Sequence, residues 1–284
     1  MSQQLRQLKS RIRSVEGTWK VTRAMEMVSM AKFKAIQSPL NMSRAYFDKV
    51  KSFFESVASV ETAGNNAFML KKPGPVGIVV ITADTGLCGV YTEHLLRLAA
   101  QFARQQKESG REIRLYVYGR KGASYLRKRG FQIERAFTAF HGKLTGNFHE
   151  KVLEDVAGDF LQQKISEVHI AHTVFHNAMK HEPLVQQFLP VEKPVEKSSN
   201  FILEFGKEGI LAELLPLYLS SRFRLMMLES LTSEHSARMV AMKSAKDNAK
   251  ELMGDLILLR NKVRQTAITK EVIEIISSVE ALKG

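Results

Sequence analysis

The chain has 284 residues, of which 44% are hydrophobic, and this is enough to fill one large domain or two small ones. Lys and Arg number 42 against 29 Asp and Glu, so the net charge of +13 favours a polyanionic neighbour: nucleic acid, acidic lipid or an acidic protein surface. Cys88 is the single cysteine, which excludes an intrachain disulfide framework and a four-cysteine zinc site.

The first predicted element is a long helix over residues 1–60. Apolar residues recur with helical spacing from Leu5 to Ala35, with one drift of a single residue, so one face of the helix is expected to be buried. The other positions are rich in base, because residues 1–50 hold ten Lys or Arg against three acids, a net +7. Pro39 is expected to bend or interrupt the helix before it resumes.

An α/β domain, Rossmann-like in type, is predicted over residues 73–206. Short apolar runs, VGIVVI, IRLYVYG and EVHIAHTVF, alternate there with helical stretches at 92–108 and 148–164. All seven prolines lie between Pro39 and Pro216, so both ends of the chain are free to form long helices. We expect the domain to be inserted between these helices.

The segment 207–284 carries the strongest periodic signal. Apolar and small residues step alternately by three and four, as in a coiled-coil seam: Met242, Ala245, Ala249, Leu252, Leu256, Leu259 and Val263. A helix from Leu217 to Leu282 would be about 100 Å long, and only the N-terminal helix is long enough to cover it. The expected fold class is therefore α/β plus coiled coil, with the terminal helices paired antiparallel as a stalk. The last turns of the longer helix then need partners from other chains.

Nothing in the sequence predicts a membrane span or a secretory signal. No apolar run reaches the roughly 18 residues that a span requires. The start of the chain alternates charged and apolar residues and lacks an apolar signal core. We expect a protein that is made and kept inside the cell.

The segment TADTGLCGVY, residues 82–91, lies between a strand and a helix, where a phosphate-binding loop would sit. It has G-x-x-G but no Gly-Lys-Ser/Thr and no dinucleotide fingerprint. Gly86, Leu87, Cys88 and Gly89 are therefore interpreted as a tight structural turn, with Cys88 as a small buried thiol. A nucleotide-dependent enzyme stays an alternative that rests on this turn alone.

Histidines and basic residues suggest two further kinds of site. His169, His172 and His176 follow one another closely, but on a strand the first two point to opposite faces, so no metal site is expected. The basic N-terminal helix could grip phosphates, yet aromatic interleaving and a nucleic-acid motif are absent. A solvated face or an acidic protein partner is favoured, and a basic coiled-coil nucleic-acid binder stays an alternative.

Two terminal segments resemble the signature segments of the gamma subunit of F-type ATP synthases. They are RIRSVEGTWKVTRAMEMVSMAKFKA near the start, and SEHSARMVAMKSAKDNAKEL with RNKVRQTAITKEVIEIISSVEAL near the end. The turn TADTGLCG, the LLPLYL stretch and the length fit the same family. The resemblance implies a rotor shaft that turns inside a hexamer of alpha and beta subunits and couples ion flow through a membrane ring to ATP synthesis or hydrolysis.

The resemblance also implies partners and a location. The inserted domain would contact the epsilon subunit and the c-subunit ring, and nucleic acid would have no part. The chain would hold no catalytic residue, cofactor or metal of its own. It would be peripheral, on the cytoplasmic face of the bacterial inner membrane.

The same resemblance assigns contact residues. By their place in the family's motifs, Met25 faces an acidic loop of beta, while Arg264, Gln265, Thr269 and Glu271 catch another loop of beta.

The chain departs from the family's pattern at a few positions, and these keep open the gamma chain of a divergent or alternate-type F-type ATPase, including a sodium-translocating one. The departures are Trp19, Thr85, Tyr91, Ser277, Ser278 and Val279.

Overall fold

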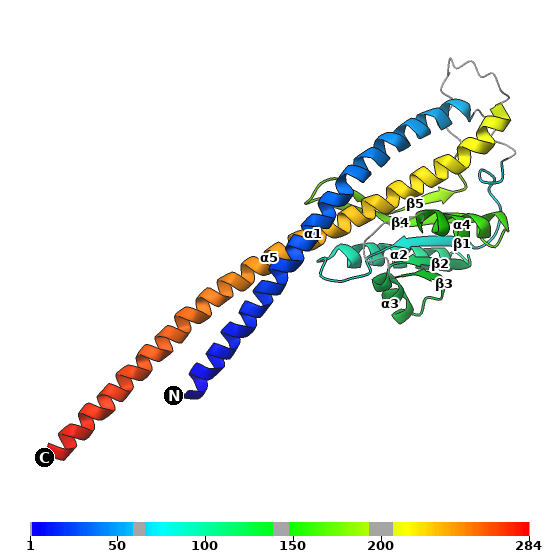
Figure 1. The fold of residues 1–284 in the computed structure, drawn as a ribbon. Coiled ribbons are helices and arrows are strands. Elements are labelled where there is room, and N and C mark those ends of the chain that lie inside the picture. Colours follow the sequence, from blue (N-terminus) through cyan, green and yellow to red (C-terminus); the bar gives the residue numbers. More distant parts are fainter. Residues whose placement is uncertain (1, 59–65, 139–147, 193–206, 284) are drawn as a thin grey trace. The chain divides into compact units, whose positions relative to one another are not determined.

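The computed structural model describes residues 2–58, 66–138, 148–192 and 207–283. Within them, a long helix at each end of the chain flanks an α/β domain (Figure 1), which confirms the predicted fold class. The elements in chain order are α1 (Ser2–Val57), β1 (Val76–Ile81), α2 (Tyr91–Glu108), β2 (Ile113–Tyr118), α3 (Arg120–Lys128), β3 (Ile133–Phe137), α4 (Phe148–Leu161), β4 (Glu167–Phe175), β5 (His181–Leu189) and α5 (Lys207–Lys283).

The strands form one sheet in the order β3-β2-β1-β4-β5. β1 pairs in parallel with β2 and β4, β2 pairs in parallel with β3, and β5 pairs antiparallel with β4. Every residue of β1 is buried, as expected for the unbroken apolar run VGIVVI inside a parallel sheet. The carboxyl end of β1 leads into the turn that precedes α2.

Both faces of the sheet are covered by helices. Ile78 and Val80 of β1 pack with residues of α2 and α3, whereas Val79 packs in a second cluster with residues of α1, α4 and α5. Successive residues of a strand point to opposite faces, which explains this division. In the second cluster, Phe54 of α1 stacks on Tyr218 of α5 with ring centroids 4.5 Å apart. The α/β domain therefore shares its core with parts of both long helices.

The chain divides into two compact units, Ser29–Arg238 and Met1–Val28 with Met239–Gly284. Each unit contains a portion of α1 beside a portion of α5. In the smaller unit, Lys246 Nζ of α5 lies 2.7 Å from Glu26 Oε2 of α1, and the two helix portions run in opposite directions (Figure 1). The predicted domain boundaries near residues 60, 73 and 207 stay a prediction.

The helix portions of the larger unit are also antiparallel. Arg44 of α1 pairs with Glu229 of α5, and Phe54, later in α1, contacts Tyr218, earlier in α5. Residue numbers rise along one helix as they fall along the other. The predicted antiparallel pairing of the terminal helices is thus confirmed.

The predicted seam of α5 is only partly filled. Met242 and Ala249 are buried, but Leu252 is 49% exposed and Leu259 is 47% exposed. The alternating spacing of three and four identifies which residues share one face of the helix. The length of the partner helix decides how many of those residues are covered. Part of this face is left for other contacts.

Pro39 does not interrupt α1, so that part of the prediction is wrong. The helix continues from Ser2 to Val57 with Pro39 inside it. The adjacent Leu40 is fully buried and packs with Phe175 of β4 and Leu228 of α5. Proline removes one helical hydrogen bond, and packing of its neighbour against two other elements offsets that loss.

Candidate functional site

The turn between β1 and α2 is strained and partly exposed. Leu87 has φ 64° and Gly89 has φ 57°, a left-handed conformation that glycine adopts freely and leucine does not. The Leu87 side chain is 58% exposed. Cys88 is buried, and its Sγ lies 3.2 Å from Oγ1 of Thr92, so the thiol faces the start of α2 and not solvent.

Arg238 of α5 binds the backbone of this turn. Its Nε donates to the carbonyl oxygen of Gly86 at 3.1 Å, and its Nη2 donates to that of Thr85 at 3.1 Å. Nη2 also donates to Oε1 of Glu234 at 2.7 Å, which completes a buried ion pair within α5. A phosphate-binding loop presents N–H groups to an anion. Here two carbonyl groups face a cation, which is the reverse arrangement.

Two buried carboxylates of α5 each form an ion pair with an arginine. Burial raises the pKa of Glu234, and the charge of Arg238 opposes that rise. Burial likewise raises the pKa of Glu229, and Arg44 of α1 opposes it from 2.7 Å. Each carboxylate therefore has a structural ion-pair partner and is not placed as a free general acid or base.

Sequence reasoning did not single out these ion pairs. Glu234 and Arg238 stand four residues apart in the segment SEHSAR, and this spacing on a helix predicts an ion pair between them. The pairing of Arg44 with Glu229 joins residues from the two ends of the chain, and no local pattern announces it.

Met25 lies on α1 in the smaller unit and is half-buried. The apolar side chains one turn before and after it are more exposed, since Val21 is 59% exposed and Val28 is 57% exposed. The helix surface around Met25 is therefore apolar and accessible.

The four α5 residues that the family motifs single out are all exposed: Arg264, Gln265, Thr269 and Glu271. The Thr269 hydroxyl donates to the backbone carbonyl of Gln265 at 3.0 Å, so within this chain it serves its own helix. Ala267, between them, is buried. Gln265 and Thr269 lie one turn apart on the side of α5 opposite Ala267, whereas Arg264 and Glu271 lie two turns apart on another side, so the helix places them as two pairs and not as one cluster.

From Ile268 onward, α5 also carries apolar residues that are each 47% to 63% exposed: Ile268, Val272, Ile273, Ile275, Ile276 and Val279. The described residues of this chain leave them uncovered. An apolar surface of this extent on one helix marks an interaction site.

The histidines do not converge. His169 contacts Glu167 at 3.4 Å, His176 contacts Glu182 at 3.0 Å, and Nε2 of His172 accepts from the side-chain amide of Gln186 at 2.7 Å. Burial lowers the pKa of His172 to about 4, so it is neutral at physiological pH. Among the residues that the structure describes, no group of three or more His, Cys, Asp or Glu could hold a metal ion.

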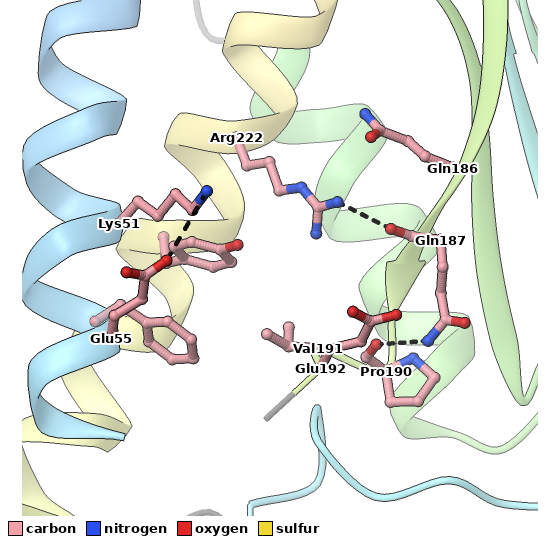
Figure 2. Close-up of a pocket in the computed structure, with 10 residues that line it drawn as sticks. Lys51, Glu55, Gln186, Gln187, Pro190, Val191, Glu192 and Arg222 are labelled. Atoms are coloured by element: carbon pink, nitrogen blue, oxygen red, sulfur yellow. Dashed lines mark hydrogen bonds and ion pairs between the residues drawn. The ribbon is translucent and has the colours of Figure 1, made fainter. Parts of the chain in front are cut away.

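A cavity of about 460 Å³ lies in the larger unit between α1, β5 and α5 (Figure 2). The Arg222 guanidinium points into it and donates to the carbonyl of Gln187 at 2.9 Å, while Lys51 pairs with Glu55 at 3.8 Å. Glu192 adds a second carboxylate to the wall. Two cations balance two carboxylates, so the wall favours neither anions nor cations.

None of the described helices is both long enough and apolar enough to cross a membrane.

Comparison with known proteins gives matches along nearly the whole chain. A family model described as ATP synthase matches residues 4–282. The ATP synthase gamma chain of Chloroflexus aurantiacus is 38% identical over 291 residues, which cover 98% of each chain. This chain belongs to the ATP synthase gamma-chain family. Gamma chains of Geotalea daltonii and Moorella thermoacetica are 34% and 35% identical over 99% and 98% of this chain, and over 99% of their own length in both cases.

Two solved structures contain chains with the same fold as this chain. A chain of the Euglena gracilis mitochondrial ATP synthase, in a structure of its OSCP, F1 and c-ring, matches with a TM-score of 0.68 at 16% identity, covering 99% of this chain and 95% of that one. A chain of the Tetrahymena thermophila mitochondrial ATP synthase, in a structure of its central stalk and c-ring, matches with a TM-score of 0.58 at 24% identity, covering 79% and 99%.

The resemblance to gamma subunits is thereby confirmed, and with it the assignment of the chain as the gamma-type subunit of an F-type ATP synthase. None of the matches favours a nucleotide-dependent enzyme or a nucleic-acid binder. The beta-contact residues and the role of the turn stay predictions.

Proposed function

We propose that this chain is the central-stalk rotor that couples ion flow through a membrane ring to the conformational cycle of catalytic beta subunits. The full-length match to gamma chains is the observation that carries the proposal. In this role the chain catalyses nothing itself. Supporting this, the buried carboxylates Glu229 and Glu234 are each paired with an arginine.

A rotor acts by presenting different surfaces to chemically identical sites, because only differential contacts shift a conformational equilibrium. The end of α5 suits this task, since all residues from 268 to 281 are exposed. Ile273 and Ile276 there are 57% and 56% exposed. Burial of these apolar side chains inside a ring of subunits would stabilise the complex. As the shaft turns, each beta subunit meets a different face of it in succession.

Specific polar contacts with beta are assigned to Arg264, Gln265, Thr269 and Glu271, and Met25 is assigned to a second beta loop. The planar guanidinium of Arg264 can hold a carboxylate through two parallel hydrogen bonds. Its exposure leaves it free to do so. The net charge of +13 complements acidic loops on the partner.

The remaining partners follow from the rotor role. We assign the α/β domain to contacts with the epsilon subunit and the c-subunit ring, and the chain to a peripheral position on the cytoplasmic face of the bacterial inner membrane. The two matching structures, one of a central stalk with a c-ring and one of OSCP, F1 and a c-ring, support this assignment.

Purification of the tagged chain from its source tests the proposal. Alpha, beta and epsilon subunits and the membrane ring should co-purify with it, and the complex in vesicles should pump ions on addition of ATP. The isolated chain should hydrolyse no ATP. Recovery of the chain without alpha and beta would refute the rotor role, and hydrolysis by the isolated chain would refute the non-catalytic role.

A further inference from the structure

Helix α5 is buried on every side between Met226 and Ser236. All eleven residues of this stretch are buried, which amounts to about three turns of helix. A helix buried all round is normally apolar. Here most residues from Glu229 to Arg238 are polar. We call five of them the polar collar: Glu229, Ser230, Glu234, Ser236 and Arg238.

The first members of the collar bond to three different elements. Glu229 accepts from Arg44 of α1 at 2.7 Å. The hydroxyl of Ser230 accepts from the backbone N–H of Thr173 in β4 at 3.1 Å, and its carbonyl oxygen accepts from the hydroxyl of Tyr91 in α2 at 2.9 Å.

The last members bond to two further segments. The hydroxyl of Ser236 donates to the carbonyl of Ala178, just after β4, at 3.0 Å. Arg238, held by Glu234, donates to the carbonyls of Thr85 and Gly86 in the turn after β1. The collar is therefore bonded to its surroundings in several directions around the helix axis.

The buried polar groups of the collar add little to the free energy of unfolding. A buried ion pair is often no more stabilising than apolar residues of the same size, because desolvation offsets the Coulomb attraction. A hydrogen bond within the protein also adds little net stability, because it replaces a hydrogen bond to water. What directional bonds do provide is a defined orientation. The side-chain tips lie about 6 Å from the helix axis, so a rotation of α5 by about 20° would move them by about 2 Å. That displacement is enough to break these hydrogen bonds together.

The collar also stands at a particular place in the chain. Arg238 is the last α5 residue of the larger unit, and α5 continues from Met239 in the smaller one. The chain passes between the units only within α1 and α5, after Val28 and after Arg238. Any torque applied to the larger unit must therefore leave it through these two helices.

We propose that the polar collar is a torsional lock that fixes the rotation of α5 about its own axis relative to the α/β domain. The lock rests on the proposed rotor function and assigns a torque-bearing role within it. With the lock intact, rotation of the α/β domain turns the distal part of α5 by the same angle. With the lock loosened, α5 slips under load, and hydrolysis continues while less work reaches the ion ring.

Two sets of variants test the lock in the complex reconstituted in vesicles. Arg238→Lys keeps the positive charge, but one ammonium cannot reproduce the fixed fork that reaches Glu234 and two carbonyls. The double variant Tyr91→Phe with Ser236→Ala removes two hydroxyl groups and little volume. Each variant loses at least two hydrogen bonds, and one lost bond changes an equilibrium about threefold, so both should lower the ions pumped per ATP by about threefold or more. Hydrolysis without a gradient should stay at the wild-type rate.

Matched controls are exposed residues of the same types, Arg224→Lys and Tyr46→Phe with Ser244→Ala, which should pump as wild type. If Arg238→Lys prevents assembly, the double variant decides. Unchanged pumping per ATP in the double variant, or pumping and hydrolysis lowered equally, would overturn the lock. Failure of the wild-type chain to assemble with alpha and beta would instead count against the rotor function.

Discussion

Replacing Arg44 by Met should destabilise the larger unit, because it leaves the buried Glu229 carboxylate without its partner. Arg44 Nη2 lies 2.7 Å and Nε lies 3.2 Å from Glu229 Oε1, and Nη2 also donates to the carbonyl oxygen of Phe175. The Glu229 side chain is only 10% exposed, so water replaces the arginine incompletely. Removing one partner of a fully buried pair costs about 3–5 kcal/mol. Since the Arg44 side chain is 34% exposed, we expect about 2–3 kcal/mol.

The pH dependence of this loss has a defined sign. Burial raises the pKa of Glu229 above 4.5, and Arg44 opposes that rise. Without Arg44 the pKa rises further, so above about pH 4.5 the folded variant holds a proton that the unfolded chain releases. The variant therefore loses stability as pH rises through this window. Its deficit relative to wild type should be larger at about pH 7.5 than at about pH 5.

Hydrogen exchange measures this deficit without requiring the isolated chain. The chain is assembled with alpha and beta, and the opening free energies of amides in α1, α5 and the end of β4 are compared at both pH values. Arg224→Met, at an exposed position of α5, is the matched control and should leave these amides unchanged. A deficit below about 1 kcal/mol, or one that is equal at both pH values, would refute the reasoning.

Three further predictions concern the partner surfaces. Arg264→Ala and Gln265→Ala should each leave the complex assembled but lower ATP hydrolysis and synthesis about threefold to tenfold, through loss of hydrogen bonds to beta; wild-type turnover in both would contradict the contact. Met25→Lys adds a charge beside an acidic loop and should lower ion pumping in vesicles more than ATP hydrolysis, whereas equal losses would argue against a coupling role. The isolated chain should aggregate, because Val272, Ile276 and their apolar neighbours are exposed, and co-expression with alpha and beta should keep it soluble; a stable monomer in sedimentation experiments would disprove this.

The sequence by itself determined where several of the regular elements lie, although α3, β3 and β5 were not predicted. The run VGIVVI became the fully buried strand β1, and the helical stretches expected at 92–108 and 148–164 became α2 and α4. The long proline-free ends became the two terminal helices, which pair antiparallel as predicted. These features depend on local hydrophobic period and on the absence of breakers, which a sequence displays directly. The family was likewise readable, because its signature segments are long.

Only the tertiary structure decided which polar residues are buried and what they bind. Arg238 and Gly86 are separated by 152 positions in the chain, yet they share a hydrogen bond, and no period in the sequence relates them. Pro39 stays inside α1 because Leu40 packs against distant elements, so tertiary contacts overrode a local breaker. Leu252 and Leu259 share the spacing of Met242 and yet remain about half exposed. Spacing selects a face of a helix, but the identity and length of the surface opposite it depend on contacts between segments far apart in the chain.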